Sequence, residues 1–162
     1  MNKLIIIICL MLQTAGIYSQ NFTVAEMEKI ATLNEDEFET FVMERGYEFV
    51  KFDKDTFADS LIFGFDKENR NQYEHYIARH KFNQKDRLMI SFQTYKTEYY
   101  LGLKKQLKSF GYKFVGTETS DDGTYFLNYK KNGMSFSLAS IQANNNSGQK
   151  FTSYEISLTK SN

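Results

Sequence analysis

The chain has little of what disulfide-stapled, thiol-dependent or proline-linked proteins require. Among its 162 residues there is one cysteine, and proline and tryptophan are absent. Cys9 lies in an amino-terminal segment that we expect to be removed, so the mature chain would contain no disulfide, no thiol nucleophile and no thiolate metal ligand. The absence of proline excludes a proline-rich linker, and no low-complexity segment marks a boundary between two domains.

An excess of charge of either sign is also missing. Twenty lysine and arginine residues balance twenty aspartate and glutamate residues, which gives a formal net charge of zero. Binding to nucleic acid requires clustered basic residues, and no such cluster is present. The sequence therefore argues against a nucleic-acid partner.

A long apolar run occurs only at the amino terminus. Lys3 precedes the apolar stretch 4–12, and small residues then lead to a cleavage site after Ser19. This order is typical of a secretory signal peptide, and the run is shorter than the roughly 20 apolar residues that span a bilayer. We expect residues 1–19 to be a signal peptide and residues 20–162 to be one mature domain without a membrane span, exported to the periplasm or the cell exterior.

Two short sequence motifs each occur twice, and the two pairs have nearly the same spacing. The segment 46–50, GYEFV, returns as GYKFV at 111–115, and ISFQT at 90–94 returns as ISLT at 156–159. Offsets of 65 and 66 positions indicate a duplicated supersecondary unit. The boundaries are about 34–94 for the first repeat and about 95–160 for the second.

Helix signals precede each repeated glycine. Thr23 with Glu26 and Asn34 with Glu37 each form the pattern of a capping box, which predicts helices over about 24–32 and 35–45. A third helix is predicted to start near Thr94 or Thr97, and its apolar stripe consists of Tyr100, Leu103, Leu107 and Phe110. Glycines 46 and 111 are predicted to end these helices in a left-handed conformation.

Alternating apolar residues follow each glycine and predict four antiparallel strands in each repeat. The predicted buried positions are Tyr47 and Phe49; Leu61, Phe63 and Phe65; Tyr73, His75 and Ile77; Leu88, Ile90 and Phe92; Tyr112 and Phe114; Tyr125, Leu127 and Tyr129; Met134, Phe136 and Leu138; and Tyr154, Ile156 and Leu158. Asn132-Gly133 predicts a type I′ hairpin turn. The fold class is therefore α+β: two αβ4-like repeats, with one layer of helices on a curved antiparallel sheet.

This order of elements resembles the tandem repeat of the β-lactamase inhibitor proteins, in which two helix-plus-four-strand units form one concave sheet. The resemblance covers most of the mature chain and concerns its layout, so it implies a single continuous sheet. The chain is also similar to small secreted α+β proteins of Gram-negative bacteria.

Motifs for catalysis or for a cofactor are not found in the sequence. There is no G-x-S-x-G elbow, no glycine-rich phosphate loop and no ordered calcium loop. The two histidines, His75 and His80, fall on opposite faces of one predicted strand, which disfavours a shared metal ion. We therefore expect a non-enzymatic protein with no catalytic, cofactor-binding or metal site.

The tyrosines exceed what a small core can bury with every hydroxyl satisfied, so some of them are expected to form contact surface. The candidate partner-binding residues are Tyr76, Arg79, His80, Met89 and the loop residues Asn144, Asn145 and Asn146. Tyr76 is predicted to lie opposite Ile77 and beside Arg79 and His80. A helix would cover Tyr76 and Met89, or else they would form an exposed binding patch.

Three functions remain open from the sequence. The first is recognition of a protein partner through an aromatic-bearing sheet face, and the second is carriage of a small apolar ligand between helices and sheet. The third is an unrecognised envelope hydrolase. An open sheet face that carries tyrosine would favour the first, a closed apolar cavity the second, and a cluster of histidine, serine and acid in a cleft the third.

Overall fold

The computed structural model describes residues 21–66, 73–84, 87–144, 148 and 150–161. The predicted signal peptide lies outside these residues. The helices are α2 (Val24–Ile30), α3 (Glu35–Met43) and α4 (Thr97–Ser109). The strands are β1 (Glu48–Lys54), β2 (Ala58–Phe65), β3 (His75–Phe82), β4 (Arg87–Thr94), β5 (Lys113–Thr119), β6 (Tyr125–Lys131), β7 (Met134–Asn144) and β8 (Lys150–Ser161). None of the helices in this part of the chain combines the length and the apolar character needed to cross a membrane.

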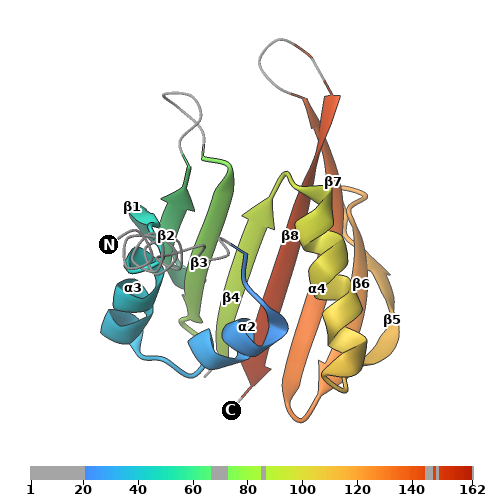
Figure 1. Ribbon diagram of the computed structural model, residues 1–162, viewed down its shortest axis with the longest axis horizontal. Helices are drawn as coiled ribbons and strands as arrows, with labels where there is room; N and C mark the ends of the chain where they lie inside the picture. The colour runs from blue at the N-terminus through green and yellow to red at the C-terminus, as the bar shows by residue number, and fades with distance from the viewer. Residues whose placement is uncertain (1–20, 67–72, 85–86, 145–147, 149, 162) are drawn as a thin grey trace, which may run out of the picture.

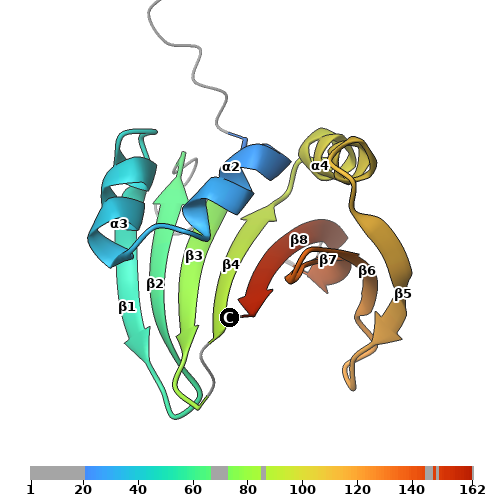
Figure 2. The same cartoon turned by 90° about the horizontal axis from the view of Figure 1, so that it is seen from below.

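Eight strands form a single antiparallel sheet in the order β1-β2-β3-β4-β8-β7-β6-β5 (Figure 1). The first four strands make one half and the last four make the other, and β4 pairs with β8 where the halves meet. Figure 2 shows that the sheet is curved and that the three helices lie on the same side of it. The predicted α+β class is confirmed.

Both predicted capping boxes are present. The Glu26 amide donates to the Thr23 hydroxyl at 3.2 Å, and the Thr23 amide donates to the Glu26 carboxylate at 2.8 Å. Asn34 and Glu37 make the same reciprocal pair at 3.0 and 2.9 Å. Each cap satisfies amides that would otherwise have no intrahelical partner and stabilises its helix by about 1 kcal/mol.

Gly46 and Gly111 end α3 and α4 with φ angles of 84° and 81°, as predicted. The amide of the tyrosine after each glycine donates to the carbonyl five residues earlier, at 3.2 Å in α3 and 3.0 Å in α4. This is the Schellman arrangement, which brings the residue after the glycine back onto the helix. Both tyrosines, Tyr47 and Tyr112, are buried in the core as a result.

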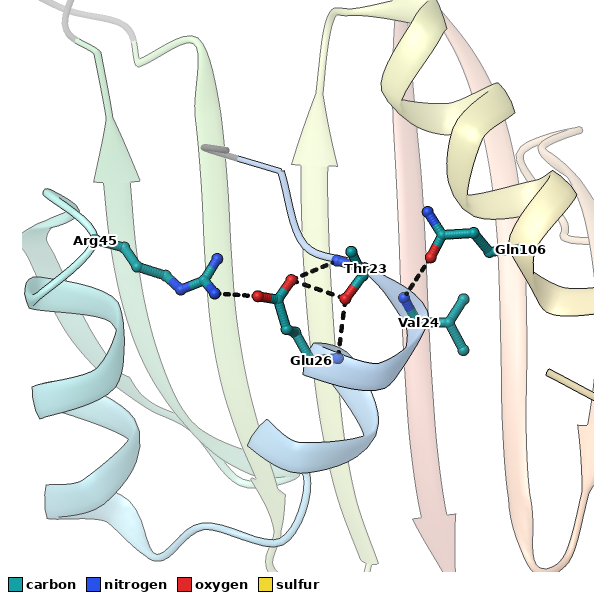
Figure 3. Close-up of polar contacts among 5 residues, drawn as sticks. All are labelled: Thr23, Val24, Glu26, Arg45 and Gln106. Atoms are coloured by element: carbon teal, nitrogen blue, oxygen red, sulfur yellow. Dashed lines mark hydrogen bonds and ion pairs between the residues drawn. The ribbon is translucent and has the colours of Figure 1, made fainter. Parts of the chain in front are cut away.

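Helix α2 connects the helices of the two halves (Figure 3). On one side Glu26 forms an ion pair with Arg45, which follows α3. On the other side the amide of Val24 donates to the Gln106 side chain of α4 at 3.1 Å. The capping residue and the first turn of α2 therefore help to hold the helical layer together across the sheet.

The core fills the space between the helices and the sheet. Its largest fully buried side chains are Phe22, Phe38, Phe63, Phe92, Phe136, Met27, Ile30, Ile77, Ile90, Leu107, Leu138 and Ile156. The predicted alternation places most of them correctly, but four predicted core residues are exposed. Phe49 and Phe114 lie on the edge strands β1 and β5, Phe110 lies past the end of α4, and Tyr125 is the first residue of β6.

The two halves have corresponding strand registers. A β-bulge follows Phe49 in β1, and another follows Phe114 in β5, 65 positions later. At the junction, Ser91 of β4 is the partner of Ser157 of β8, and the two differ by 66 positions. The β6–β7 turn has φ angles of 45° at Asn132 and 77° at Gly133, as a type I′ turn requires.

The paired glycines provide the first prediction. Gly111→Ala is expected to lower the free energy of unfolding by about 1–2 kcal/mol, because a Cβ atom is unfavourable in the left-handed region. Gly46→Ala is expected to cost more, because its Cβ would also lie 3.3 Å from the Phe65 ring. Urea unfolding of both variants measures the difference, and equal losses would contradict the contribution of the Phe65 contact.

Candidate functional site

The sheet face turned away from the helices, called here the open face, carries a polar centre. Side chains of β2, β3, β4 and β8 that alternate with core residues point to it. In register order across the middle of the sheet, Ile62, Ala78, Ser91 and Ser157 share one row of this face. Helices cover the opposite face (Figure 2).

A hollow of about 380 Å³ opens on this face, and it is called here the central hollow. It is lined by Val50, Lys51, Ile62, Tyr76, Ala78, His80, Met89, Ser91, Gln93 and Glu155. Three of the predicted partner-binding residues, Tyr76, His80 and Met89, are therefore brought together. The alternative that a helix covers Tyr76 and Met89 is wrong, because the helices pack on the other face.

Two serine hydroxyls hold His80 in place. Nδ1 lies 2.8 Å from the Ser60 hydroxyl, and Nε2 lies 2.9 Å from the Ser91 hydroxyl. A neutral imidazole has one N–H donor and one acceptor nitrogen, so one serine accepts a hydrogen bond and the other donates one. Burial lowers the pKa of His80 and favours this neutral form.

Tyr76 is positioned by Tyr73 and Gly64. The Tyr73 amide donates to the Tyr76 hydroxyl at 3.2 Å, and the two rings meet edge to face at 5.7 Å. The Tyr73 ring lies directly over Gly64, where a Cβ atom would approach its Cγ to 2.3 Å. The sequence prediction placed Tyr73 inside the strand, but it precedes β3 and packs on the open face instead.

Glu155 is a member of the hollow that the sequence analysis missed. It lies on β8 beside Gln93 of β4, and its carboxylate has no hydrogen bond or ion pair within the described residues. Burial raises its pKa. Its strand position opposite the core residues Tyr154 and Ile156 was readable from the alternation, but its neighbours across the sheet were not.

Arg79 does not belong to the open face, so its predicted place beside Tyr76 is wrong. Positions 76 and 79 have opposite parity on a strand and point to opposite faces. The Arg79 guanidinium lies 3.9 Å from the Glu35 carboxylate on the helix side. It lines a second hollow of about 530 Å³, together with Lys81 and Arg87.

The predicted partner-binding residues Asn144, Asn145 and Asn146 have no described side chain that can be placed relative to the central hollow. Asn144 is the last residue of β7, where its backbone pairs with Lys150. The side chain of Asn144 and the whole of Asn145 and Asn146 lie outside the described residues.

His75 lies on the helix side, fully buried among aromatic rings. The ring centroids of Phe65, Phe92 and Tyr99 lie 5.2–6.1 Å from its own. Neither ring nitrogen has a hydrogen-bond partner in the described part of the chain, and the Glu74 carboxylate is 4.0 Å from Nε2. Burial lowers the pKa of His75 to about 4.

The two histidines point to opposite faces of β3, as predicted, so one ion cannot take both. Among the described residues, no group of three or more histidine, cysteine, aspartate or glutamate side chains is placed to hold a metal ion.

The His80–Ser91 pair lacks the partners that activate a serine nucleophile. Nδ1 of His80 is bonded to the hydroxyl of Ser60 instead of a carboxylate. Ser91 lies in the middle of β4, which is paired on both sides by β3 and β8. The backbone amides near Ser91 are therefore used in hydrogen bonds between strands and are not free to form an oxyanion hole. The geometry suits binding better than acyl transfer.

The chain matches no protein-family model, and neither curated proteins nor solved structures give a significant match. The site is therefore interpreted from its own geometry.

The folded protein is expected to lose stability in acid because His75 is buried in its neutral form. The His75 pKa is about 4 in the folded state and near 6.5 when unfolded. The contribution of neutral His75 to the free energy of unfolding is therefore complete above pH 6.5 and is lost as the pH falls from 6.5 to about 4. The loss attributable to His75 is on the order of 3 kcal/mol. His75→Met, which keeps an apolar side chain of similar volume, should remove most of it.

Urea unfolding at several pH values between 4 and 8 measures this effect. His80→Gln serves as the comparison, because it removes the other histidine and leaves His75 in its aromatic surroundings. An unchanged pH dependence in the His75→Met protein would contradict the assignment.

Proposed function

We propose that the mature chain is an exported, non-catalytic binding module that recognises a protein partner through the open face. The observation that carries this proposal is the central hollow, where Tyr76, His80 and Met89 converge on a sheet face that the helices leave uncovered. Tyrosine and methionine are enriched at protein interfaces, where they supply large contact area.

The hollow is organised before any partner arrives. Hydrogen bonds fix the rings of His80 and Tyr76, and both residues extend from β3, an interior strand of the sheet. Side chains that are already ordered lose little entropy on binding, which leaves more of the contact energy for affinity. This rigidity supports recognition of a folded surface by shape and polar complementarity.

We also propose that the two halves are duplicates of one helix-plus-four-strand unit. The matching bulges after Phe49 and Phe114, the matching Schellman ends and the junction pair Ser91–Ser157 support it. When the two halves are aligned on Ser91 and Ser157, Ala139 on β7 corresponds to His80 on β3. The site would then be a specialisation of the first repeat alone.

The other two functions have weaker support. A carrier would need an apolar space between helices and sheet, but fully buried side chains such as Phe38, Phe63 and Phe92 occupy that region. A hydrolase would need an acid on His80 and free amides near Ser91. The Ser60 hydroxyl occupies the position of the acid, and the pairing of β4 on both sides engages the amides.

Export of the chain is part of the proposal, with the periplasm or the cell exterior as its destination. It rests on the order of Lys3, the apolar run 4–12 and the cleavage site after Ser19. Removal of residues 1–19 should keep the protein in the cytoplasm with its fold intact. Fractionation and circular dichroism check both parts, and loss of folding on this deletion would contradict the signal-peptide assignment.

Partner recognition is tested with tagged residues 20–162 on envelope extract and culture fluid. A protein captured in saturable, stoichiometric amount is expected, and Met89→Arg should weaken its binding at least about tenfold by filling the hollow. Leu101→Arg is the matched control, because it makes the same change at an exposed position on α4. Equal binding by wild type and Met89→Arg, with loss on Leu101→Arg, would move the site to the helical side.

A further inference from the structure

Glu155 carries the one charge on the wall of the central hollow that has no counterpart among the described residues. Lys51, the other fully charged lining residue, is paired with Asp53 at 2.6 Å. His80 is held in its neutral form between two hydroxyls. The Glu155 carboxylate is therefore the unpaired charge that the hollow presents to whatever enters it.

The polar groups nearest to Glu155 direct their hydrogen bonds elsewhere. Gln93, its partner across the β4–β8 ladder, donates from Nε2 to the Ser153 hydroxyl at 2.9 Å. The Ser157 hydroxyl donates to the Ser137 carbonyl at 3.5 Å, and Ser91 is bonded to His80. A half-buried carboxylate with neither donors nor a cation is costly, and a donor from outside would remove that cost.

The rest of the wall suits a long side chain with a cationic end. Tyr76 contributes an aromatic ring to the wall, and aromatic rings attract guanidinium and ammonium groups. Ile62, Ala78 and Met89 supply apolar contact for a methylene stem. At about 380 Å³ the hollow lies near the lower end of ligand-site volumes, which is enough space for one long side chain.

We propose that the central hollow receives one arginine side chain from the surface of the protein partner. The guanidinium pairs with the Glu155 carboxylate and stacks near Tyr76, and the stem lies against Met89. Arginine fits better than lysine, because its planar fork can bind a carboxylate through two hydrogen bonds while stacking on a ring. This inference rests on the proposed function, since it names the chemistry by which the open face selects its partner.

The probe for this site is N-acetyl-arginine amide, titrated at pH 7.5 into residues 20–162 labelled at the methyl groups of methionine and alanine. We expect saturable NMR shifts at Met89 and Ala78, with a dissociation constant on the order of 1 mM for so small a ligand. N-acetyl-citrulline amide, which has nearly the same shape without the charge, should bind at least about tenfold more weakly. Equal affinity for the two probes would overturn the proposal.

Glu155→Gln is the decisive variant, and it should weaken binding of the arginine probe at least about tenfold. It is expected to fold, because burial of the charged carboxylate opposes folding at pH 7.5 and a neutral amide removes that opposition. Glu118→Gln is the matched control, since Glu118 is exposed on the edge strand β5 of the same face. Unchanged binding in Glu155→Gln would overturn the proposal.

Parallel measurements with the captured partner separate this inference from the proposed function. Loss of partner binding on both Met89→Arg and Glu155→Gln supports the arginine receptor. Loss on Met89→Arg alone keeps the open face as the interface and refutes the arginine receptor. Charge-dependent binding of the arginine probe without any protein partner refutes both the proposed function and the protein source of the guest, and it makes a free cationic molecule the ligand.

Discussion

The pairing of β4 with β8 is the constraint on which the rest of the structure depends. These strands join the two halves, from Arg87 opposite Ser161 to Thr94 opposite Tyr154. Their alternation sends Phe92 and Ile156 beneath the helices and leaves Ser91, Gln93, Glu155 and Ser157 on the open face. A slip of one residue would exchange the two sets, placing a carboxylate in the core and phenylalanine in water. The helical layer and the central hollow therefore require the same register.

The parts of the fold that depend on neighbouring residues could be predicted from the sequence. Both capping boxes, both glycine helix ends and the Asn132-Gly133 turn form within a few residues, so their patterns are sufficient. Alternation also identified the buried face of most strands. Phe49 and Phe114 were misassigned because their exposure depends on β1 and β5 being the outermost strands, and this is a property of the whole sheet. Tyr73 was misassigned because it lies before β3 and packs over Gly64 of the neighbouring strand β2, a contact that the alternation within one segment does not reveal.

The candidate site was predictable to a similar extent. Tyr76, His80 and Met89 could be grouped because they lie within 14 positions of sequence on two consecutive strands. Arg79 was grouped with them because it is close in sequence, although its position on β3 directs its side chain to the opposite face of the sheet. Glu155 and Ser60 could not be found, since their roles depend on which strands lie beside β3 and β4. The charge that gives the hollow its character therefore comes from the opposite half of the chain.

The two bulges have a consequence for how molecules of this protein meet one another. An eight-stranded antiparallel sheet ends in two edges, and the free backbone groups of an edge strand can pair with a strand of another molecule. Here each edge strand, β1 and β5, is interrupted by a bulge near its start, after Phe49 and Phe114. A bulge twists the strand and breaks its regular spacing of donors and acceptors. The bulges therefore discourage edge-to-edge pairing with other molecules at both ends of the sheet, even though each edge strand exposes a phenylalanine.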